Sequence, residues 1–336
     1  MNVYKDLTTL SKFNKAVVTI GTFDGVHLGH QEIIKQIKQE AEIIGGETVI
    51  VTFHPHPRNI VGDTSGVKLL TTLNEKIVLL EQQGIDNLVI VNFNDAFAKL
   101  TAEEYVKDFL YTKLNPHTLI IGYDHKFGKD RTGDYHMLEI FGKALNFCVK
   151  EIHQHIINTV TVSSTEIRKA LLHSNITVAN KLLGYNYFFE GTVIKGDQLG
   201  RTIGYPTANL QLTNEEKLVP GDGVYAVKVS RLQATKQTIN EVQSTEYQVQ
   251  NESKFLPRTS NLTVLNGMMY IGSRPVVNGK RRVIEINIFN FDEDIYGEVL
   301  HVSILQYTRG DMPFTGLETL KQQLSKDKEI ITNLLQ

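Results

Sequence analysis

Apolar runs and helical spacing alternate through the first half of the chain. Five apolar runs predict strands at Ala16–Thr22, Thr48–Phe53, Leu88–Phe93, Leu119–Gly122 and Asn146–Ile152. Between them, apolar residues recur at the three- and four-residue spacing of helices in Gln31–Ile44, Asn74–Gln83, Ala102–Leu114 and Tyr135–Leu145. This alternation predicts a parallel sheet wrapped by helices, with ligands bound beyond the carboxyl ends of the strands.

From about Leu183 the pattern changes to short β-rich runs separated by turn residues. These runs predict strands at Tyr187–Ile194, Val224–Val229, Met268–Ile271, Val283–Phe291 and Val299–Tyr307. Their spacing is typical of an antiparallel barrel, and Leu317–Leu335 has the pattern of a closing helix. The polar stretch Gln233–Ser260 predicts an extended hairpin or a long loop. We therefore predict two domains, residues 1–183 and 184–336.

The length, net charge and cysteine content of the chain limit the kinds of partner that it can bind. A chain of 336 residues is long enough for two domains, and its formal net charge of −2 argues against nonspecific binding to nucleic acid or to anionic membranes. The single cysteine, Cys148, excludes an intrachain disulfide and is predicted to lie in a buried strand. We expect a cytoplasmic protein with small-molecule ligands, no export signal, no membrane span and no obligate protein partner.

The segment Gly-Thr-Phe-Asp-Gly-Val-His-Leu-Gly-His, residues 21–30, follows the first predicted strand. A helix that begins near Leu28 would present free N–H groups and its positive dipole end to an anion, and the glycines would let a phosphate approach the backbone. His27 and His30 are three residues apart and can share one helix face. A strand, a glycine turn and a helix can also be packing alone. The paired histidines favour a phosphate site.

This segment resembles the His-x-Gly-His motif of the nucleotidyltransferase superfamily, and its flanking residues resemble bacterial flavin adenylyltransferases. The resemblance implies a Rossmann-like domain that transfers an adenylyl group from ATP to FMN, giving FAD and pyrophosphate. It implies catalytic roles for His27 and His30. It also implies ATP or phosphate contacts by Gly21, Phe23, Asp24, Gly25, His27 and His30.

Two loops follow later strands of the predicted sheet. The first is His54-Pro55-His56-Pro57, and four histidines near one sheet edge can suggest zinc. Since no cysteine or His-Glu-x-x-His helix accompanies them, we favour a role in shaping the nucleotide pocket or capping the strand. The second loop, Gly122–Asp134, can be a solvated turn. It resembles the Gly-x-Asp-x-x-Phe-Gly segment of the same family, which implies that Asp124 contacts the flavin.

The stretch Ser163-Ser164-Thr165-Glu166-Ile167-Arg168 stands at the head of an amphipathic helix. Either serine can cap that helix. Arg168, one turn into the helix, can neutralise charge on pyrophosphate with its fork of donors. The stretch resembles the Ser-Ser-Thr-x-Ile-Arg motif of the same family. The resemblance implies that the second half of the ATP site is formed by Ser163, Ser164, Thr165 and Arg168.

A glycine-rich segment and the sequence Pro206-Thr207-Ala208-Asn209 open the β-rich half. Its glycines suit a flap over phosphates, or they serve as barrel corners and bulges. The four-residue sequence resembles the Pro-Thr-Ala-Asn motif of riboflavin kinases, which implies that Thr207 and Asn209 hold Mg²⁺ through oxygen ligands. The resemblance extends ATP and phosphate binding to Gly191, Lys195, Gly196, Gly200, Thr207 and Asn209.

Glu285 alternates with Ile284 and Ile286 in a predicted strand, so its side chain points to the opposite face from theirs. An isolated glutamate in a strand can simply face solvent. The resemblance to riboflavin kinases instead implies that Glu285 is the base that accepts the proton of the riboflavin 5′-hydroxyl. It also implies that Arg274 and Glu285 contact the flavin.

Over nearly the whole chain, the motifs are similar to those of bifunctional bacterial riboflavin kinase/FAD synthetases. The family makes FMN from riboflavin and then FAD from FMN, with ATP as substrate and Mg²⁺ as cofactor. One alternative is a nucleotidyltransferase for another phosphorylated acceptor, such as phosphopantetheine or nicotinamide mononucleotide, which the Pro-Thr-Ala-Asn barrel argues against. Another is a flavin-binding regulator with decayed catalysis, which the retained polar residues of every motif argue against.

Overall fold

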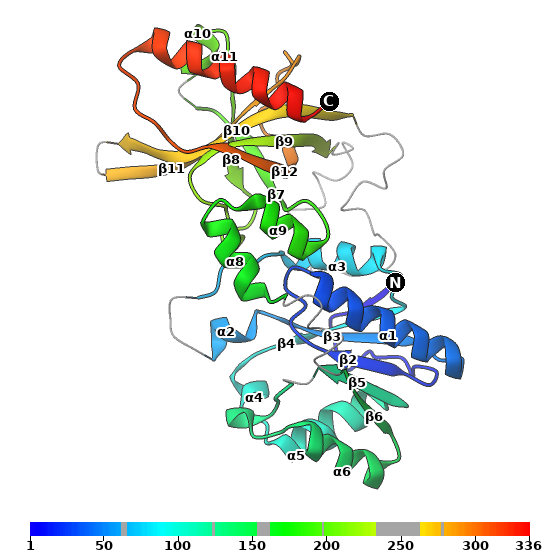
Figure 1. Cartoon of the computed structure of the whole chain (residues 1–336). Coiled ribbons are helices and arrows are strands. Elements are labelled where there is room, and N and C mark those ends of the chain that lie inside the picture. The colour runs from blue at the N-terminus through cyan, green and yellow to red at the C-terminus, as the bar shows by residue number, and fades with distance from the viewer. Residues whose placement is uncertain (62–65, 123–124, 153–161, 197, 233–262, 277–278) are drawn as a thin grey trace. The chain divides into compact units, whose positions relative to one another are not determined.

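The computed structural model describes residues 1–61, 66–122, 125–152, 162–196, 198–232, 263–276 and 279–336. They form two compact units, residues 1–164 and 165–336, which run from blue to green and from green to red in Figure 1. The helices α8 (Ser164–Leu172) and α9 (Ile176–Leu183) group almost entirely with the second unit. The domain boundary at residue 183 stays a prediction.

The first unit contains a six-stranded parallel sheet with the strand order β1-β4-β3-β2-β5-β6. Its strands are β1 (Asn2–Tyr4), β2 (Val17–Ile20), β3 (Thr48–His54), β4 (Asn87–Asn92), β5 (Thr118–Gly122) and β6 (Cys148–Ile152). The central strands are buried on both faces, as apolar runs in a parallel sheet require. The predicted parallel sheet is confirmed.

Helices cover both faces of this sheet. Figure 1 shows α1 (Leu28–Ile44) and α3 (Leu73–Gln82) on one side, and α5 (Ala102–Glu104) and α6 (Tyr135–Leu145) on the other. The predicted helix at 102–114 is present as α5 continued by the π-helix η1 (Tyr105–Leu114). Short helices complete the connections: α2 (Pro57–Ile60), α4 (Asp95–Ala98) and η2 (Lys129–Arg131).

The prediction that Cys148 is buried is wrong. Cys148 is exposed at the start of β6, which is the last strand of the sheet and alternates between exposed and covered positions. Among the residues that the structure describes, β6 pairs with a single strand, β5. An edge strand needs no continuous apolar run. Of the apolar residues before Cys148, Leu145 ends α6, and Phe147 lies between α6 and β6.

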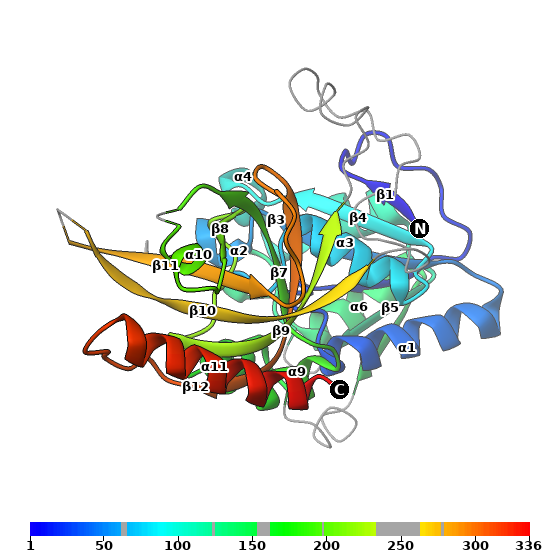
Figure 2. The ribbon, with the colours of Figure 1, turned by 90° about the horizontal axis from the view of Figure 1, so that it is seen from above.

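The second unit contains a closed antiparallel barrel with the strand order β10-β11-β8-β7-β12-β9. Its strands are β7 (Phe188–Ile194), β8 (Ala208–Leu212), β9 (Gly223–Leu232), β10 (Val264–Val276), β11 (Gly279–Ile288) and β12 (Val299–Arg309). The short helix α10 (Leu199–Thr202) precedes β8. The closing helix α11 (Leu317–Leu334) lies along the outside of the barrel beside β10 (Figure 1 and Figure 2). The predicted barrel and closing helix are confirmed.

The polar stretch 233–260, predicted to be an extended hairpin or a long loop, lies outside the described residues. Among the helices that are described, none is both long and apolar enough to cross a membrane.

Candidate active sites

The order in which strands are added to the parallel sheet reverses between β2 and β5. From β2 the chain moves to β3 and β4 on one side, and the later strands β5 and β6 lie on the other. Ligands of such sheets bind beyond the carboxyl ends of the strands at this switch point. The segment 21–30 follows β2 directly, so the structure places it where a ligand is expected. Asp124, predicted from the loop after β5, lies outside the described residues.

The turn between β2 and α1 has a strained backbone. Phe23 and Val26 have positive φ angles of 47° and 36°, and Gly25 lies between them at 86°. Such angles suit glycine, whereas a non-glycine residue held there costs about 1–3 kcal/mol. The side chains of Phe23 and Val26 are both buried, which helps to offset that cost. Strain of this kind is concentrated at functional sites.

His27 and His30 lie together at the start of α1. The helix begins at Leu28, as predicted, and His27 is its N-cap, with Nδ1 accepting a hydrogen bond from the His30 backbone N–H at 3.4 Å. The two imidazole rings stack with their centroids 3.7 Å apart, and the Phe23 ring lies 4.9 Å from that of His30. The predicted pairing of the histidines at a helix start is therefore present.

His30 is neutral near pH 7. Burial, together with the nearby charges of His27 and Lys76, lowers the pKa of His30 well below its usual value of 6.5. Its Nδ1 is buried and has no hydrogen-bond partner among the residues that the structure describes. A neutral imidazole carries one N–H and one acceptor nitrogen. His30 can thus offer a hydrogen bond to a phosphate oxygen, but not a full positive charge.

Asp24 ties the strained turn to the segment before α3. Its carboxylate accepts hydrogen bonds from the backbone N–H groups of Leu70 (3.1 Å) and Thr71 (2.9 Å) and from the Thr71 hydroxyl (3.2 Å). The Thr71 hydroxyl also accepts from the Gly25 N–H at 3.0 Å. These contacts support a positioning role for Asp24, because a carboxylate repels phosphate. Its direct contact with ATP stays a prediction.

The second predicted motif meets this turn at Ser164, whose hydroxyl donates to the Asp24 carbonyl oxygen at 3.0 Å. Ser164 begins α8, and Ser163 before it is exposed. Thr165 is exposed and Arg168 is half-buried on the same helix, within the second compact unit. Ser164 is thus brought to the first motif, whereas phosphate contacts by Ser163, Thr165 and Arg168 stay predictions.

In the barrel, Glu285 of β11 pairs directly with Asn209 of β8 and with Tyr270 of β10. Directly paired residues of neighbouring strands share one face of a sheet. Tyr270 packs in the apolar cluster that includes Ile331 of α11. Glu285 is only 8% exposed. The glutamate is therefore buried rather than solvent-facing.

Two of the predicted glycines lie against the Pro-Thr-Ala-Asn segment. A Cβ at Gly196 would collide with the side-chain amide of Asn209. A Cβ at Gly200 would collide with the Tyr205 carbonyl and lie 3.4 Å from the Thr207 hydroxyl. Gly200 has no room for a side chain because a backbone carbonyl lies against it, and a side chain at Gly196 would displace the Asn209 amide.

The remaining predicted kinase residues are placed differently. Gly191 lies inside β7 opposite Leu212, where its close approach to Leu210 and Gln211 serves barrel packing. Lys195 is exposed just after the same strand. Arg274 lies in β10, and its side chain is outside the described part of the chain.

The oxygen atoms of Thr207 and Asn209 fit Mg²⁺ better than a softer metal. Both residues are half-buried, and the cradle that Gly196 and Gly200 form beside them would be filled by a Cβ. Mg²⁺ commonly uses few protein ligands and completes its shell with substrate phosphates and water. Within the described ranges, no group of three or more His, Cys, Asp or Glu side chains is placed to hold a metal.

Two polar residues near these sites were missed by the sequence analysis. Asn287 is buried two residues after Glu285, and its Nδ2 donates to the Pro206 carbonyl oxygen at 2.7 Å. The alternating pattern that singled out Glu285 places Asn287 on the same face and was a usable signal. Lys76 of α3 is buried and donates a hydrogen bond to the Thr22 carbonyl oxygen of the strained turn. It belongs to none of the motifs identified in the sequence.

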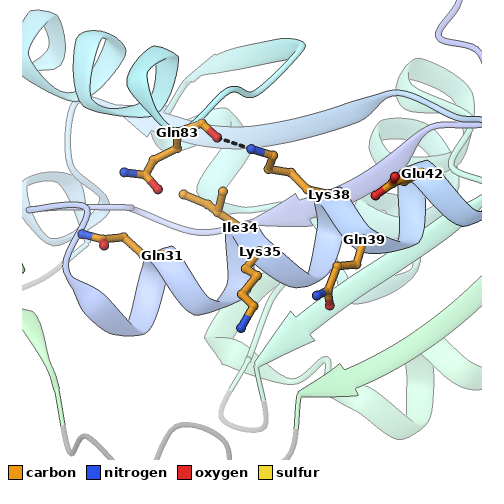
Figure 3. A pocket seen from close by; sticks show the side chains of 7 residues that line it. All are labelled: Gln31, Ile34, Lys35, Lys38, Gln39, Glu42 and Gln83. Atoms are coloured by element: carbon orange, nitrogen blue, oxygen red, sulfur yellow. Dashed lines mark hydrogen bonds between the residues drawn. The ribbon is translucent and has the colours of Figure 1, made fainter.

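A hollow of about 270 Å³ lies away from these residues, on the exposed side of α1 (Figure 3). Its lining residues are Gln31, Ile34, Lys35, Lys38, Gln39, Glu42 and Gln83. Lys38 donates to the Gln83 carbonyl oxygen at 2.8 Å across it. None of the predicted site residues lines this hollow.

Together, the two units define a class of protein, in which a Rossmann-like nucleotidyltransferase domain precedes a riboflavin kinase barrel. The family model for FAD synthetase matches residues 10–166, and that for riboflavin kinase matches residues 183–335. The chain belongs to the family of bifunctional riboflavin kinase/FMN adenylyltransferases. The predicted family and the pair of enzymatic domains are therefore confirmed.

Relatives with this family's name cover almost the whole chain. The bifunctional riboflavin kinase/FMN adenylyltransferase of Buchnera aphidicola subsp. Schizaphis graminum is 35% identical and covers 98% of both chains. That of Bacillus subtilis is 36% identical over 94% of this chain and 91% of its own. A solved structure titled as a macrolide-efflux protein from Streptococcus pneumoniae is 28% identical, with a TM-score of 0.80 over 98% of both chains. Its title names another activity, although its fold is shared throughout.

Proposed function

We propose that the chain makes FAD from riboflavin in two ATP-dependent steps. The barrel unit transfers the γ-phosphoryl group of ATP to the 5′-hydroxyl of riboflavin, giving FMN and ADP. The parallel-sheet unit then joins the FMN phosphate to the α-phosphorus of ATP and releases pyrophosphate. The observation that carries this proposal is that one chain holds both a histidine pair at a sheet switch point and a buried glutamate opposite the Pro-Thr-Ala-Asn segment.

In the kinase step, Glu285 accepts the proton of the riboflavin 5′-hydroxyl. A base must lie within hydrogen-bond reach of the hydroxyl proton that it accepts, and this hydroxyl attacks the γ-phosphoryl group. Asn209, one of the predicted magnesium ligands, is directly opposite Glu285. Thr207 and Asn209 would hold Mg²⁺, which would neutralise phosphate charge when bound. Gly196 and Gly200 bring backbone close to both ligands and leave room for the phosphates.

In the adenylyl transfer step, the protein positions two phosphates and forms no covalent bond with the nucleotide. The N-terminal N–H groups of α1 and the imidazoles of His27 and His30 supply hydrogen bonds to the ATP phosphates. Ser163, Ser164, Thr165 and Arg168 complete this site, and Arg168 neutralises the departing pyrophosphate. The contact of Ser164 with the turn supports its inclusion.

The proposal makes flavins, ATP and Mg²⁺ the ligands of the chain and places the reactions in the cytoplasm, where ATP is abundant. Its test measures each half-reaction separately in the purified protein. Riboflavin with ATP and Mg²⁺ should release ADP, and FMN with ATP and Mg²⁺ should release pyrophosphate. Release of pyrophosphate with phosphopantetheine or nicotinamide mononucleotide, but not with FMN, would instead favour another acceptor.

A further inference from the structure

Lys76 of α3 is a buried lysine that makes two hydrogen bonds below the strained turn. Its Nζ donates to the Thr22 carbonyl oxygen at 2.7 Å and to the Thr52 hydroxyl oxygen at 3.3 Å. The Thr52 hydroxyl donates to the same carbonyl at 3.0 Å. A single carbonyl of the turn therefore accepts hydrogen bonds from side chains of α3 and β3.

The position of that carbonyl matters because of the residue that follows it. The Thr22 carbonyl belongs to the peptide that leads into Phe23, whose φ angle of 47° is strained. Fixing this peptide plane helps to hold Phe23 in the left-handed region, and Asp24 fixes the next part of the turn through Leu70 and Thr71. An ammonium group is costly to bury, so a buried lysine with these partners indicates a specific need for its charge or its donors.

Lys76 also provides positive charge near the neutral His30. Burial lowers the pKa of Lys76 to about 8, and the carboxylate of Asp24 opposes that shift. The ionisable groups near it are Asp24 on the turn and His30 on α1, while Glu75, beside it on α3, accepts from the Thr72 N–H at 2.8 Å. At pH 7 Lys76 is therefore mostly charged, whereas His30 is neutral.

We propose that Lys76 is a positioning residue for adenylyl transfer. Its ammonium group holds the glycine turn in its strained form through the Thr22 carbonyl and adds positive charge beneath the bound triphosphate. This inference rests on the adenylyl transfer proposed for the first unit. Lys76 acts through the turn and needs no contact with ATP.

The test compares Lys76→Met, which removes the charge and the donors, with Lys76→Arg, which keeps both. Lys38→Met is the matched control, because it also removes a lysine bond to a backbone carbonyl, but on the exposed face of α1 (Figure 3). Lys76→Met should lower kcat for FAD formation from FMN about a hundredfold, the size of effect seen when a preorganised electrostatic group is lost. Lys76→Arg should retain about a tenth of wild-type kcat or more. Lys38→Met should stay within about twofold, as expected for an exposed bond.

The pH profile separates positioning by charge from a purely structural role. The wild-type rate of FAD formation should fall above about pH 8 as Lys76 loses its proton. Lys76→Arg should lack this fall, because its guanidinium stays protonated. The same fall in Lys76→Arg, or equal losses in Lys76→Met and Lys38→Met, would overturn the inference. If Lys76→Met does not fold, the profile of Lys76→Arg carries the test. No FAD from wild-type protein would overturn the proposed adenylyl transfer, and this inference with it.

Discussion

Glu285 and Asn209 lie directly opposite each other on β11 and β8 of the barrel. Side chains in this register share one face, with their Cβ atoms about 5 Å apart. A predicted base and a predicted magnesium ligand, 76 positions apart in the sequence, therefore stand side by side on one face of the barrel. This pairing brings the proton acceptor and the phosphate-binding segment to one substrate.

Replacing Glu285 by glutamine should abolish the kinase step alone. The amide cannot accept the hydroxyl proton, so FMN formation should fall at least about a hundredfold, as is typical when a general base is lost. FAD formation from added FMN should be unchanged, because it belongs to the other unit. The matched control is Glu298→Gln, which alters a carboxylate of the same barrel that pairs with Arg231. Equal loss of both activities in Glu285→Gln would contradict separate sites.

Asn209→Ala should change the magnesium dependence of FMN formation. Loss of one oxygen ligand should raise the Mg²⁺ concentration that gives half-maximal rate severalfold, and a chelator should stop the wild-type reaction. Titration of Mg²⁺ at saturating ATP measures this effect. Gln211→Ala, two residues along the same strand, is the control and should behave as wild type. An unaltered Mg²⁺ titration of Asn209→Ala would remove this residue from the metal site.

His30→Ala should make the reaction stop at FMN. Loss of the imidazole at the start of α1 removes a hydrogen bond to phosphate and the ring that stacks on His27, so FAD formation should fall at least about a hundredfold. Chromatography of the flavin products measures this accumulation. His136→Ala, an exposed histidine of α6 in the same unit, should make FAD at the wild-type rate. Undiminished FAD synthesis by His30→Ala would exclude the histidine from the mechanism.

A buried ion pair fixes α11 on the barrel. Asp327 of α11 is fully buried and accepts hydrogen bonds from Arg309 at 2.8–3.1 Å and from Gln323 at 2.8 Å. Asp327→Asn should destabilise the protein by roughly 3 kcal/mol, because it leaves the charge of Arg309 uncompensated. Asp222→Asn breaks an exposed pair with Arg282 and should cost less than about 1 kcal/mol. Denaturant unfolding measures the loss of stability in both variants. A loss below about 1 kcal/mol in Asp327→Asn, as expected for Asp222→Asn, would show that the buried pair does not stabilise the protein.

The buried charge of Lys76 also predicts how stability depends on pH. The pKa of Lys76 is about 8 in the folded chain, below its usual value of 10.5. Below pH 8 both states carry the proton, and burial of the charge destabilises the folded state by roughly 3 kcal/mol. Between pH 8 and 10.5 the unfolded state binds more protons, so stability rises with pH. The free energy of unfolding of Lys76→Met minus that of wild type should therefore shrink by up to roughly 3 kcal/mol across this range. A constant difference would show that burial does not lower the pKa of Lys76.

The repeating patterns of apolar and polar residues predicted most of the fold, because apolar positions are the ones that the folded chain buries. The buried strands β2 to β5 and the helix α6 appear where their apolar patterns placed them. The pattern failed at edges and in short elements. Cys148 is exposed because β6 is an edge strand. The strand β8 was missed although its five residues, Ala208–Leu212, alternate between apolar and polar.

The candidate sites could be predicted only where the residues of a site lie close together in the sequence. His27 and His30 are three residues apart on one helix, so a short motif was enough to pair them. Lys76 reaches the turn from 54 residues further along the chain, and no spacing rule links it to Thr22. Asp24 was predicted to contact phosphate, whereas its carboxylate engages backbone N–H groups that only the folded chain brings near. Long-range hydrogen bonds of this kind have no sequence signature.

The most direct test of the central claim is a chromatographic time course of flavins, with purified protein, riboflavin, ATP and Mg²⁺. Two sites on one chain predict that FMN appears first and then declines as FAD accumulates. FMN that persists with no FAD would contradict adenylyl transfer to FMN, and riboflavin that stays unchanged would contradict both activities.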